Sequence, residues 1–444
     1  MGVIVSEQYA PVERHASQGS RMYSLMAELY PICRSITGRG VEKTLSIIQK
    51  YIPLLIHKIP SGTKVFDWEI PKEWNIVDAY VKNMKGEKVI DFSHSNLHLV
   101  SYSIPIHRKV TLQELKEHLH TLPDHPDWIP YRTSYYKEDW GFCIAYNEFA
   151  LLTDDYYEVC IESSLEPGHL TYGEFLIEGE STDEVLITTH ICHPSLCNDN
   201  LSGICVASFL AQELSKNKKR YSYRFLFIPG TIGAITWLSI NELATKKIKH
   251  GLVAALLGDD SDFTYKKSSQ GNAEIDLIVE EALRSTLGQY TLVKYSPYGY
   301  DERQFCSPGF NLPVGCLSRT PYYKYPEYHT SADNLDLVKP KTLEGSLDIF
   351  LLVIKLLEAN KRYVNTNPKC EPNLGKRGLY SLVGNDKSNH DYQLALLWIL
   401  NLSDGIRSLL DISRESGVDF QSICLGADKL EKSGLLIDVQ LSSP

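Results

Sequence analysis

Apolar residues recur at different spacings along the chain, and the changes of spacing divide it into regions. Between residues 20 and 56 they recur every three or four positions, which predicts two helices. From about 86 to 170 the pattern changes to short β-rich runs cut by prolines, at 96–104, 142–146 and 156–161. We expect this region to form a β-rich subdomain inserted into the rest of the fold.

Beyond residue 173, apolar strands alternate with helices. The expected strands are 184–189, 223–228, 252–257 and 312–317, and the expected helices are 202–214, 234–244, 272–287 and 341–359. Alternating strands and helices with short connections predict a mainly parallel, mixed sheet with helices on both faces. The expected fold class is therefore α/β.

The last part of the chain has a third pattern. Residues 365–378 have the composition of a linker, and 409–437 have helix-turn-helix spacing with Gly417 at the turn, followed by a strand. We therefore expect a C-terminal winged helix-turn-helix domain. The expected boundaries are 1–85 and 171–363 for the two parts of one α/β domain, 86–170 for the insert, and 364–444 for the linker and winged helix.

Composition restricts the class of protein. The 444 residues are 43% hydrophobic and 23% charged, as in ordinary soluble proteins, and the net charge of −10 argues against a broad surface for nucleic acid or anionic membrane. The sequence has no apolar run of bilayer-spanning length and no signal-peptide pattern, so we expect a cytoplasmic protein. The ten scattered cysteines are expected to be reduced.

The C-terminal domain is acidic as well. Residues 401–444 contain four basic and seven acidic residues, and the expected reading helix, 420–432, has no arginine to contact guanine edges. A packing or dimerisation role is therefore favoured over DNA binding.

Imidazole and carboxylate side chains follow several of the expected strands. They are His190, His193 and Asp199 after the first strand, Asp259 after the third and His329 after the last. Ligands of α/β sheets bind beyond the carboxyl ends of the strands, so these side chains are expected to converge. Mixed nitrogen and oxygen ligands favour a divalent metal site, with zinc as the default ion.

Several of these residues have simpler interpretations when each is taken alone. A single histidine after a strand, such as His190, is most often a surface residue or a satisfied core residue. Cys192 and Cys197 would suit zinc thiolates, but without a matching distant pair they are better explained as small buried hydrophobic residues. Asp259 and Asp260 would also suit a helix N-cap. The combination at separate strand ends is what favours a metal site.

The segments around these residues resemble a known family. The motifs at 190–203 and 328–333 resemble the zinc-dependent aminopeptidases of the bacterial leucyl aminopeptidase and glutaminyl cyclase type. The segments 30–38, 60–68 and 296–306 are more closely similar to aminopeptidase-like proteins with a C-terminal winged helix, often encoded among bacterial surface-polysaccharide genes. The resemblance covers nearly the whole chain.

This resemblance implies a two-metal peptidase plan. His190 would bind one zinc ion, Asp199 would bridge two, Asp259 would complete the first set and His329 would serve the second ion. His193 is a further candidate ligand, Asp333 is expected to orient His329 from outside the metal site, and Tyr328 and Arg303 are expected to contact substrate. The implied reaction is hydrolysis of a peptide or small amide bond, in the context of surface-polysaccharide metabolism.

One position departs from the family pattern. The aminopeptidases have two adjacent glutamates after the second strand, a general base and a metal ligand, and the closer relatives keep one, whereas this chain has Gly230. Loss of a general base costs about 10²- to 10⁴-fold in rate. We therefore expect one well-occupied zinc site and a weak or absent second one, with weakened activity.

The acidic pair Asp301 and Glu302 provides the candidate catalytic residues, with Glu302 as the hypothetical substitute base, and an ion pair of Glu302 with Arg303 is the equally favoured alternative. The segment 131–141 is rich in tyrosine and would suit a loop over the pocket or a core-and-rim role. Two other functions stay open: a catalytically inactive metal-binding, ligand-binding or assembly protein of this fold, and a DNA-binding regulator, which the charge disfavours. The expected partner is a peptide or small amide, with no nucleic acid and no membrane, and homo-oligomerisation is left open.

Overall fold

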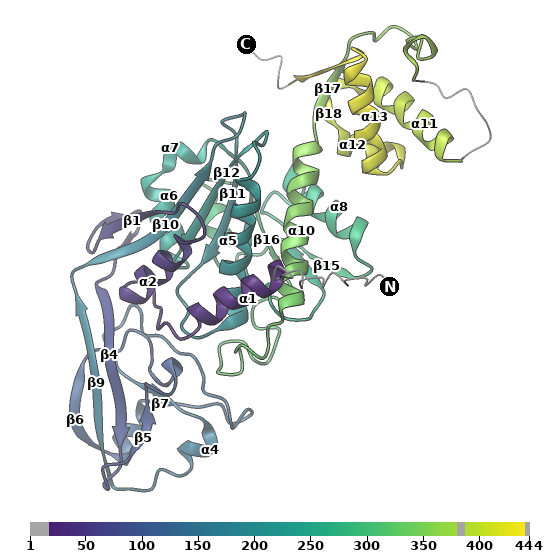
Figure 1. Ribbon diagram of the computed structural model, residues 1–444. Coiled ribbons are helices and arrows are strands. Elements are labelled where there is room, and N and C mark those ends of the chain that lie inside the picture. The colour runs from purple at the N-terminus through teal and green to yellow at the C-terminus, as the bar shows by residue number, and fades with distance from the viewer. Residues whose placement is uncertain (1–16, 380–386, 440–444) are drawn as a thin grey trace, which may run out of the picture. The chain divides into compact units, whose positions relative to one another are not determined.

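The computed structural model describes residues 17–379 and 387–439. The chain forms two compact units, the first ending at Phe350 and the second beginning at Leu351. The first unit contains a large mixed sheet with its helices and a smaller β-rich subdomain (Figure 1).

The large sheet has eight strands in the order β1-β10-β12-β11-β13-β16-β14-β15. Their bounds are β1 Leu55–Pro60, β10 His169–Ile177, β11 Glu184–His190, β12 Ser222–Ile228, β13 Ile248–Ala254, β14 Phe263–Lys266, β15 Tyr290–Val293 and β16 Val314–Ser318. The four central strands β12, β11, β13 and β16 are parallel, β1 and β10 are antiparallel additions at one edge, and β14 is antiparallel to β16. The predicted mainly parallel, mixed α/β sheet is confirmed.

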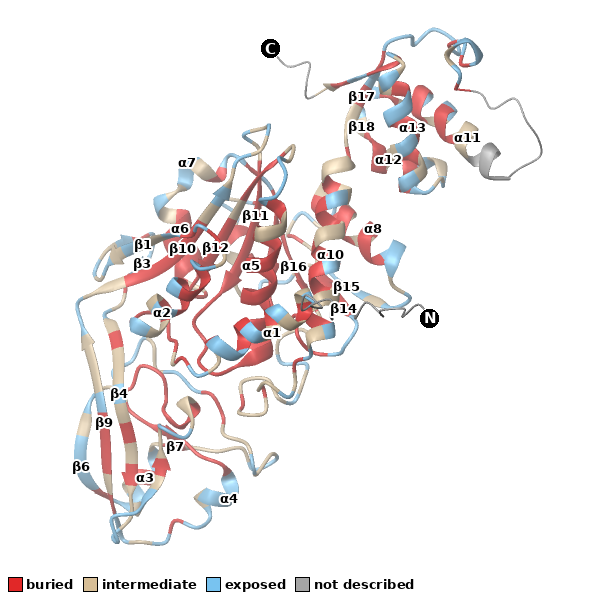
Figure 2. Ribbon diagram, in the orientation of Figure 1, coloured by how far each residue is buried: buried red, intermediate tan, exposed pale blue. Residues whose placement is uncertain are grey.

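Helices cover both faces of this sheet. Their bounds are α1 Gln18–Leu29, α2 Arg39–Ile48, α5 Gly203–Leu214, α6 Ile232–Ile240, α7 Glu242–Thr245, α8 Glu274–Thr286, α9 Glu302–Phe305 and α10 Pro340–Ala359. In Figure 1, α1, α2 and α5 lie in front of the sheet and α6 lies behind it. Figure 2 shows that α5 and the central strands are almost entirely buried, because apolar residues face both layers.

The β-rich subdomain is built on a four-stranded sheet in the order β5-β4-β9-β6. The bounds are β4 Glu73–Lys82, β5 Lys88–Asp91, β6 Ile106–Thr111 and β9 Tyr156–Glu166; the short elements are α3 Leu112–Glu117, β7 Leu119–His120, β8 Phe142–Cys143 and α4 Tyr146–Phe149. The hairpin of β2 Lys64–Val65 and β3 Trp68–Glu69 is a separate two-stranded sheet, and β2 contacts α6. The predicted strand at 96–104 was wrong, since this segment is the 3-10 turn Asn96–His98 followed by a loop. Most of its apolar side chains are buried, which imitates the pattern of a strand. Its β-pairing among the described residues is limited to two isolated bridges, Leu99 with Phe142 and Ser101 with Thr133.

The second unit has the elements of a winged helix. Their bounds are β17 Arg362–Asn365, α11 Lys387–Leu402, β18 Asp404–Ser408, α12 Leu409–Ser416, α13 Phe420–Lys432 and β19 Leu436–Asp438. Ser408 and Asp411 form a capping box at the start of α12, and Gly417 ends it with a φ of 73°, a conformation that glycine adopts readily. The helix-turn-helix prediction at 409–437 is therefore confirmed.

Two further expectations concern the chain as a whole. The ten cysteines are all free, and Cys192 and Cys197 are fully buried, as the small-hydrophobe interpretation requires. Among the described helices, none combines the length and the apolar character needed to cross a bilayer.

Candidate metal centre

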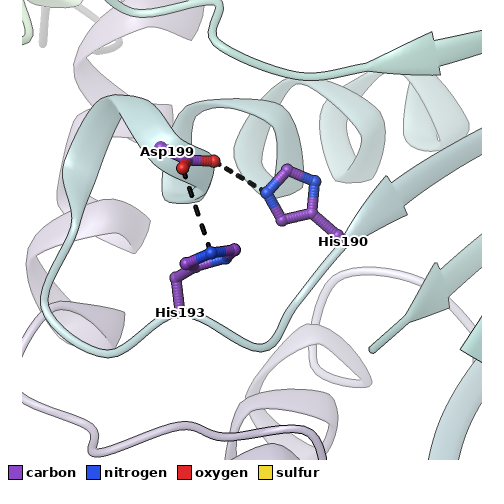
Figure 3. Close-up of side chains that lie close together, drawn as sticks. All are labelled: His190, His193 and Asp199. Carbon is purple, nitrogen blue, oxygen red and sulfur yellow. Dashed lines mark hydrogen bonds and ion pairs between the residues drawn. The ribbon is translucent and has the colours of Figure 1, made fainter. Parts of the chain in front are cut away.

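The candidate metal centre lies at the carboxyl end of β11. His190 is the last residue of this strand, His193 lies in the following loop, and Asp199 precedes α5. One ligand atom from each of these three residues lies within 4.8 Å of the others, and all three residues are buried. Figure 3 shows both imidazoles turned toward the Asp199 carboxylate, with His190 Nε2 2.8 Å from Oδ1 and His193 Nε2 4.0 Å from Oδ2.

His329 approaches the same carboxylate from a distant part of the chain. Its Nε2 lies 2.9 Å from Asp199 Oδ2. Both oxygens of Asp199 therefore face imidazole nitrogens that come from three separate positions. His329 adopts a φ of 56°, an uncommon conformation for a residue with a side chain, and such conformations gather at functional sites.

The electrostatics of the centre suit a cation. Burial lowers the pKa of His193 well below its usual value, despite the nearby Asp199 carboxylate, so the ring is neutral at pH 7. Burial alone would raise the pKa of Asp199, but His193, His190 and His329 hold it well below its usual range. Imidazole nitrogens around an ionised carboxylate are the donor set that zinc uses in proteins.

Asp259 does not belong to this cluster. Its Oδ2 accepts a hydrogen bond from Asn198 Nδ2 at 2.9 Å, and its Oδ1 accepts one from Thr320 Oγ1 at 3.0 Å. It also accepts the backbone N–H of Ser261, but no helix begins there, so the N-cap alternative does not apply. Asp259 thus holds the residue next to Asp199 instead of joining the three clustered donors.

Asp333 supports the centre through the backbone. Its two oxygens accept the N–H groups of Asn198 at 2.5 Å and Asp199 at 2.9 Å, and Tyr325 donates its hydroxyl to it at 3.2 Å. Burial raises the pKa of Asp333 to about 7, although these N–H groups act in the opposite direction. Asp333 therefore fixes Asp199, and not the ring of His329 as the family pattern implied.

Arg34 is a residue that the sequence analysis missed. Its side chain is fully buried; Nε donates to the carbonyl oxygen of His193 at 2.8 Å, and Nη1 donates to that of Leu29 at 2.7 Å. Burial lowers the pKa of Arg34 to about 10. The segment 30–38 contributed to the family resemblance, but nothing in its pattern revealed this contact with the metal-site loop.

Tyr300 occupies the position left by the missing glutamate. Its ring lies 4.4 Å from that of His190 between centroids, and its hydroxyl lies 3.3 Å from Cys192 Sγ and 3.4 Å from the carbonyl oxygen of Gly230. Tyr300 therefore packs between the end of β12 and the candidate metal ligands. No pattern in the sequence indicates this contact.

The two candidate acidic residues have different surroundings. Glu302 is buried and accepts hydrogen bonds from Lys266 Nζ at 2.7 Å and from the backbone N–H of Tyr300 at 3.1 Å, so its ion-pair partner is Lys266 and not Arg303. Asp301 is also buried, but neither of its oxygens has a hydrogen-bond partner among the described residues. Burial, followed by the charge of Glu302, raises the pKa of Asp301 well above its usual value.

A cavity of about 720 Å³ adjoins the candidate centre. His193 and His329 form part of its wall, as do Glu302, Arg303 and Tyr328. Tyr328 stacks on His329 with ring centroids 4.0 Å apart. The two expected substrate-binding residues thus lie in the same cavity as the candidate ligands, whereas Asp301 is not part of the cavity wall.

The β-rich subdomain contributes to this cavity. Tyr131 and Arg132 line it, and the backbone N–H of Tyr131 donates to the carbonyl oxygen of His329 at 2.8 Å. Ser331 and Ile129 are also joined by a backbone hydrogen bond. Part of the tyrosine-rich loop therefore borders the pocket, while Trp140, at its other end, is buried against His118.

Comparisons with known proteins agree with this architecture. Residues 23–360 match the family described as "Domain of unknown function (DUF4910)", and residues 361–438 match a winged helix-turn-helix family. A Clostridium acetobutylicum protein is 55% identical over 425 residues, covering 96% of this chain and 98% of the relative. That relative is named as a candidate polysaccharide biosynthesis protein with an aminopeptidase-like domain.

Solved structures show the same fold. The crystal structure of a candidate peptidase from Clostridium acetobutylicum has a TM-score of 0.89 at 55% identity, covering 95% of this chain and 96% of that one. A zinc aminopeptidase from Bacillus subtilis has a TM-score of 0.55 at 12% identity, covering 76% of this chain and 94% of that one. The chain therefore has an aminopeptidase-like fold.

Proposed function

The chain belongs to the DUF4910 family and has an aminopeptidase-like fold, and on this basis we propose that it is a zinc-dependent hydrolase of a peptide or small amide bond. The observation that carries the proposal is the position of Asp199. Its carboxylate is surrounded by His190, His193 and His329, and two of these histidines line a cavity of about 720 Å³. The name of the Clostridium relative suggests that the substrate belongs to polysaccharide biosynthesis.

Asp199 and the three histidines would hold one zinc ion. Zinc in such a site polarises a carbonyl group and lowers the pKa of bound water. Asp333 holds the backbone of Asp199, and Arg34 holds the backbone of His193. Glu302 is the proposed proton acceptor, because it lines the same cavity and is fixed by Lys266 and the Tyr300 N–H. Arg303 and Tyr328 would contact the substrate.

A second candidate function is ligand binding without catalysis. The position of the family's general base is Gly230, and the ring of Tyr300 fills the adjacent space. This contact favours the non-catalytic function, in which the pocket still binds its ligand but has lost the general base. Under this alternative the cavity and the metal donors act as a binding or assembly module.

The experiment that tests the metal centre is elemental analysis of the purified protein and its variants. We expect about one zinc ion per chain in the wild type and a large loss in Asp199→Asn. His94, an exposed histidine of the β-rich subdomain, provides a matched control through His94→Gln. Equal zinc content in Asp199→Asn and the wild type would contradict the proposed centre.

The experiment that tests catalysis is an assay of small amides, both with and without a free amine, using the zinc-loaded protein. We expect measurable turnover and a drop of about 10²- to 10⁴-fold in Glu302→Gln, as for loss of a general base. Unchanged turnover would remove Glu302 from the mechanism. Zinc binding without turnover by the wild type would instead favour the binding module.

We also propose that the winged helix serves packing or homo-oligomer assembly in a cytoplasmic protein. Residues 401–444 are more acidic than basic, and α13 carries no arginine that could contact base edges. A mobility-shift assay at about 150 mM salt should show no binding to duplex DNA. Retained binding under these conditions would contradict the proposal.

A further inference from the structure

The charge of the cavity wall is opposite to that of the protein. The chain as a whole has a net charge of −10, but four cations line the cavity: Arg132, Lys266, Arg303 and Lys324. Its wall contains one acidic residue, Glu302, whose side chain is paired with Lys266 at 2.7 Å. This pairing leaves three cations in excess.

The three remaining cations are available to a ligand. Arg132, Arg303 and Lys324 make no ion pair with any residue that the structure describes. Arg132 and Lys324 are exposed at the cavity, and Arg303 is half-buried. Guanidinium groups present paired donors that match carboxylate and phosphate, and a cleft lined by one sign of charge concentrates ligands of the opposite sign.

The same wall disfavours a cationic ligand. The substrate of an aminopeptidase presents a free ammonium group, which an acidic side chain must balance where it is removed from water. The carboxylate of Glu302 already balances the charge of Lys266. A substrate amine in this part of the cavity would therefore meet three positive charges and no free carboxylate on the wall.

Besides the cations, the cavity wall contains exposed aromatic rings. Tyr298 and Tyr323 are 68% and 63% exposed, and their ring centroids lie 5.8 Å apart in the cavity wall. Exposed aromatic faces suit a ligand that presents a ring face.

We propose that this cavity binds a ring-shaped ligand, such as a sugar, that carries a carboxylate or phosphate group, with the anion at Arg303, Lys324 and Arg132 and the ring against Tyr298 and Tyr323. The inference names the substrate class of the site in which the proposed function locates hydrolysis, and in that respect it rests on that function. The negative charge would hold the substrate while its amide bond faces His193 and His329.

A series of ligands with one ring and different charges tests the proposal by calorimetry on the full-length protein. The probes are glucose, glucosamine, glucuronate and glucose 6-phosphate, which are respectively neutral, cationic and, for the last two, anionic. We expect at least one anionic probe to bind about tenfold or more tightly than glucose, and glucosamine to bind no better than glucose. The two anionic probes separate a carboxylate site from a phosphate site.

Variants assign the effect to this cavity. The double variant Arg303→Met/Lys324→Met should weaken binding of the preferred anion about tenfold or more, while Lys85→Met, an exposed cation on a distant turn, should leave it unchanged. Thermal unfolding confirms that each variant is folded. Equal binding of all four probes, no binding of either anion, or full binding by the double variant would overturn the proposal.

The outcome is distinguishable from that of the proposed function. Calorimetry records binding whether or not an amide bond is cleaved. A protein that prefers an anionic sugar but hydrolyses no amide would contradict the hydrolase and leave the charge assignment standing. Amide hydrolysis without any preference for an anionic ligand would support the hydrolase and contradict the charge assignment.

Discussion

The ring of Tyr300 occupies the space that a side chain at Gly230 would need. A Cβ atom added to Gly230 would lie 2.0 Å from Cε1 of Tyr300, far inside any real contact distance. Because Tyr300 also contacts His190 and Cys192, it cannot move aside without disturbing the candidate metal centre. The glutamate that is missing here is therefore replaced by a packed aromatic ring.

Restoring the glutamate alone should consequently fail. We expect Gly230→Glu to destabilise the fold by about 1–3 kcal/mol through overpacking, and to add no hydrolytic activity. In Gly230→Glu/Tyr300→Ala the ring is removed, so part of the stability should return and turnover of amino-acid amides should exceed that of Tyr300→Ala. Thermal unfolding and the amide assay measure both effects. A stable and more active Gly230→Glu variant would contradict the packing argument.

Asp301 should make the stability of the protein depend on pH. Burial raises the pKa of this carboxyl well above its usual value, so the folded state keeps the proton after the unfolded state has lost it. Stability from this group is full below the ordinary pKa of about 4 and decreases as the pH rises through and above that value.

Asp301→Asn should remove this dependence. The neutral amide cannot ionise, so we expect the variant to gain stability relative to the wild type at pH 8 and to gain little at pH 4. Urea unfolding at several pH values measures the difference, and Asp124→Asn, at an exposed position, is the matched control. The same stability difference between wild type and Asp301→Asn at every pH would rule out a shifted pKa at Asp301.

Much of the fold could be predicted because its central strands are buried along their length. Every residue of β11 is buried, and the strand contains the apolar run 185–187, whereas β1 and β15 are partly exposed and show no such run. Edge strands of this kind, whether antiparallel like β1 or parallel to their neighbour like β15, need pairing partners that the local sequence does not specify.

The candidate site was predictable only in part, for a similar reason. Residues at strand ends, such as His190, could be found because the topology of the sheet gathers strand ends together. Arg34 and Tyr300 act through contacts with residues 159 and 70 positions away, and Asp259 follows a strand but points to Asn198. Contacts between residues so far apart in the sequence depend on side-chain packing, which no spacing in the sequence encodes.

Arg34 should position the metal-site loop. Arg34→Met removes the donor to the His193 carbonyl and leaves buried carbonyl oxygens without partners, which costs about 1–3 kcal/mol. Because His193 would lose its support, zinc affinity should fall by about 10- to 100-fold, as it does when other partners of metal ligands are removed. Chelator competition measures the affinity, and Arg39→Met, at an exposed position, is the control. Lower stability with unchanged zinc affinity would limit Arg34 to a structural role.

Asp259 and Asp199 should respond differently to the same substitution. Asp199→Asn removes the only carboxylate within the cluster of candidate donors, so zinc affinity should fall by more than 100-fold. Asp259→Asn keeps a side chain that can exchange hydrogen bonds with Asn198 and Thr320, so the expected loss is under tenfold. Zinc titration against a fluorescent chelator compares the two variants under identical conditions. Equal losses would mean that Asp259 moves into the site when the metal binds, which would return it to the ligand set implied by the family pattern.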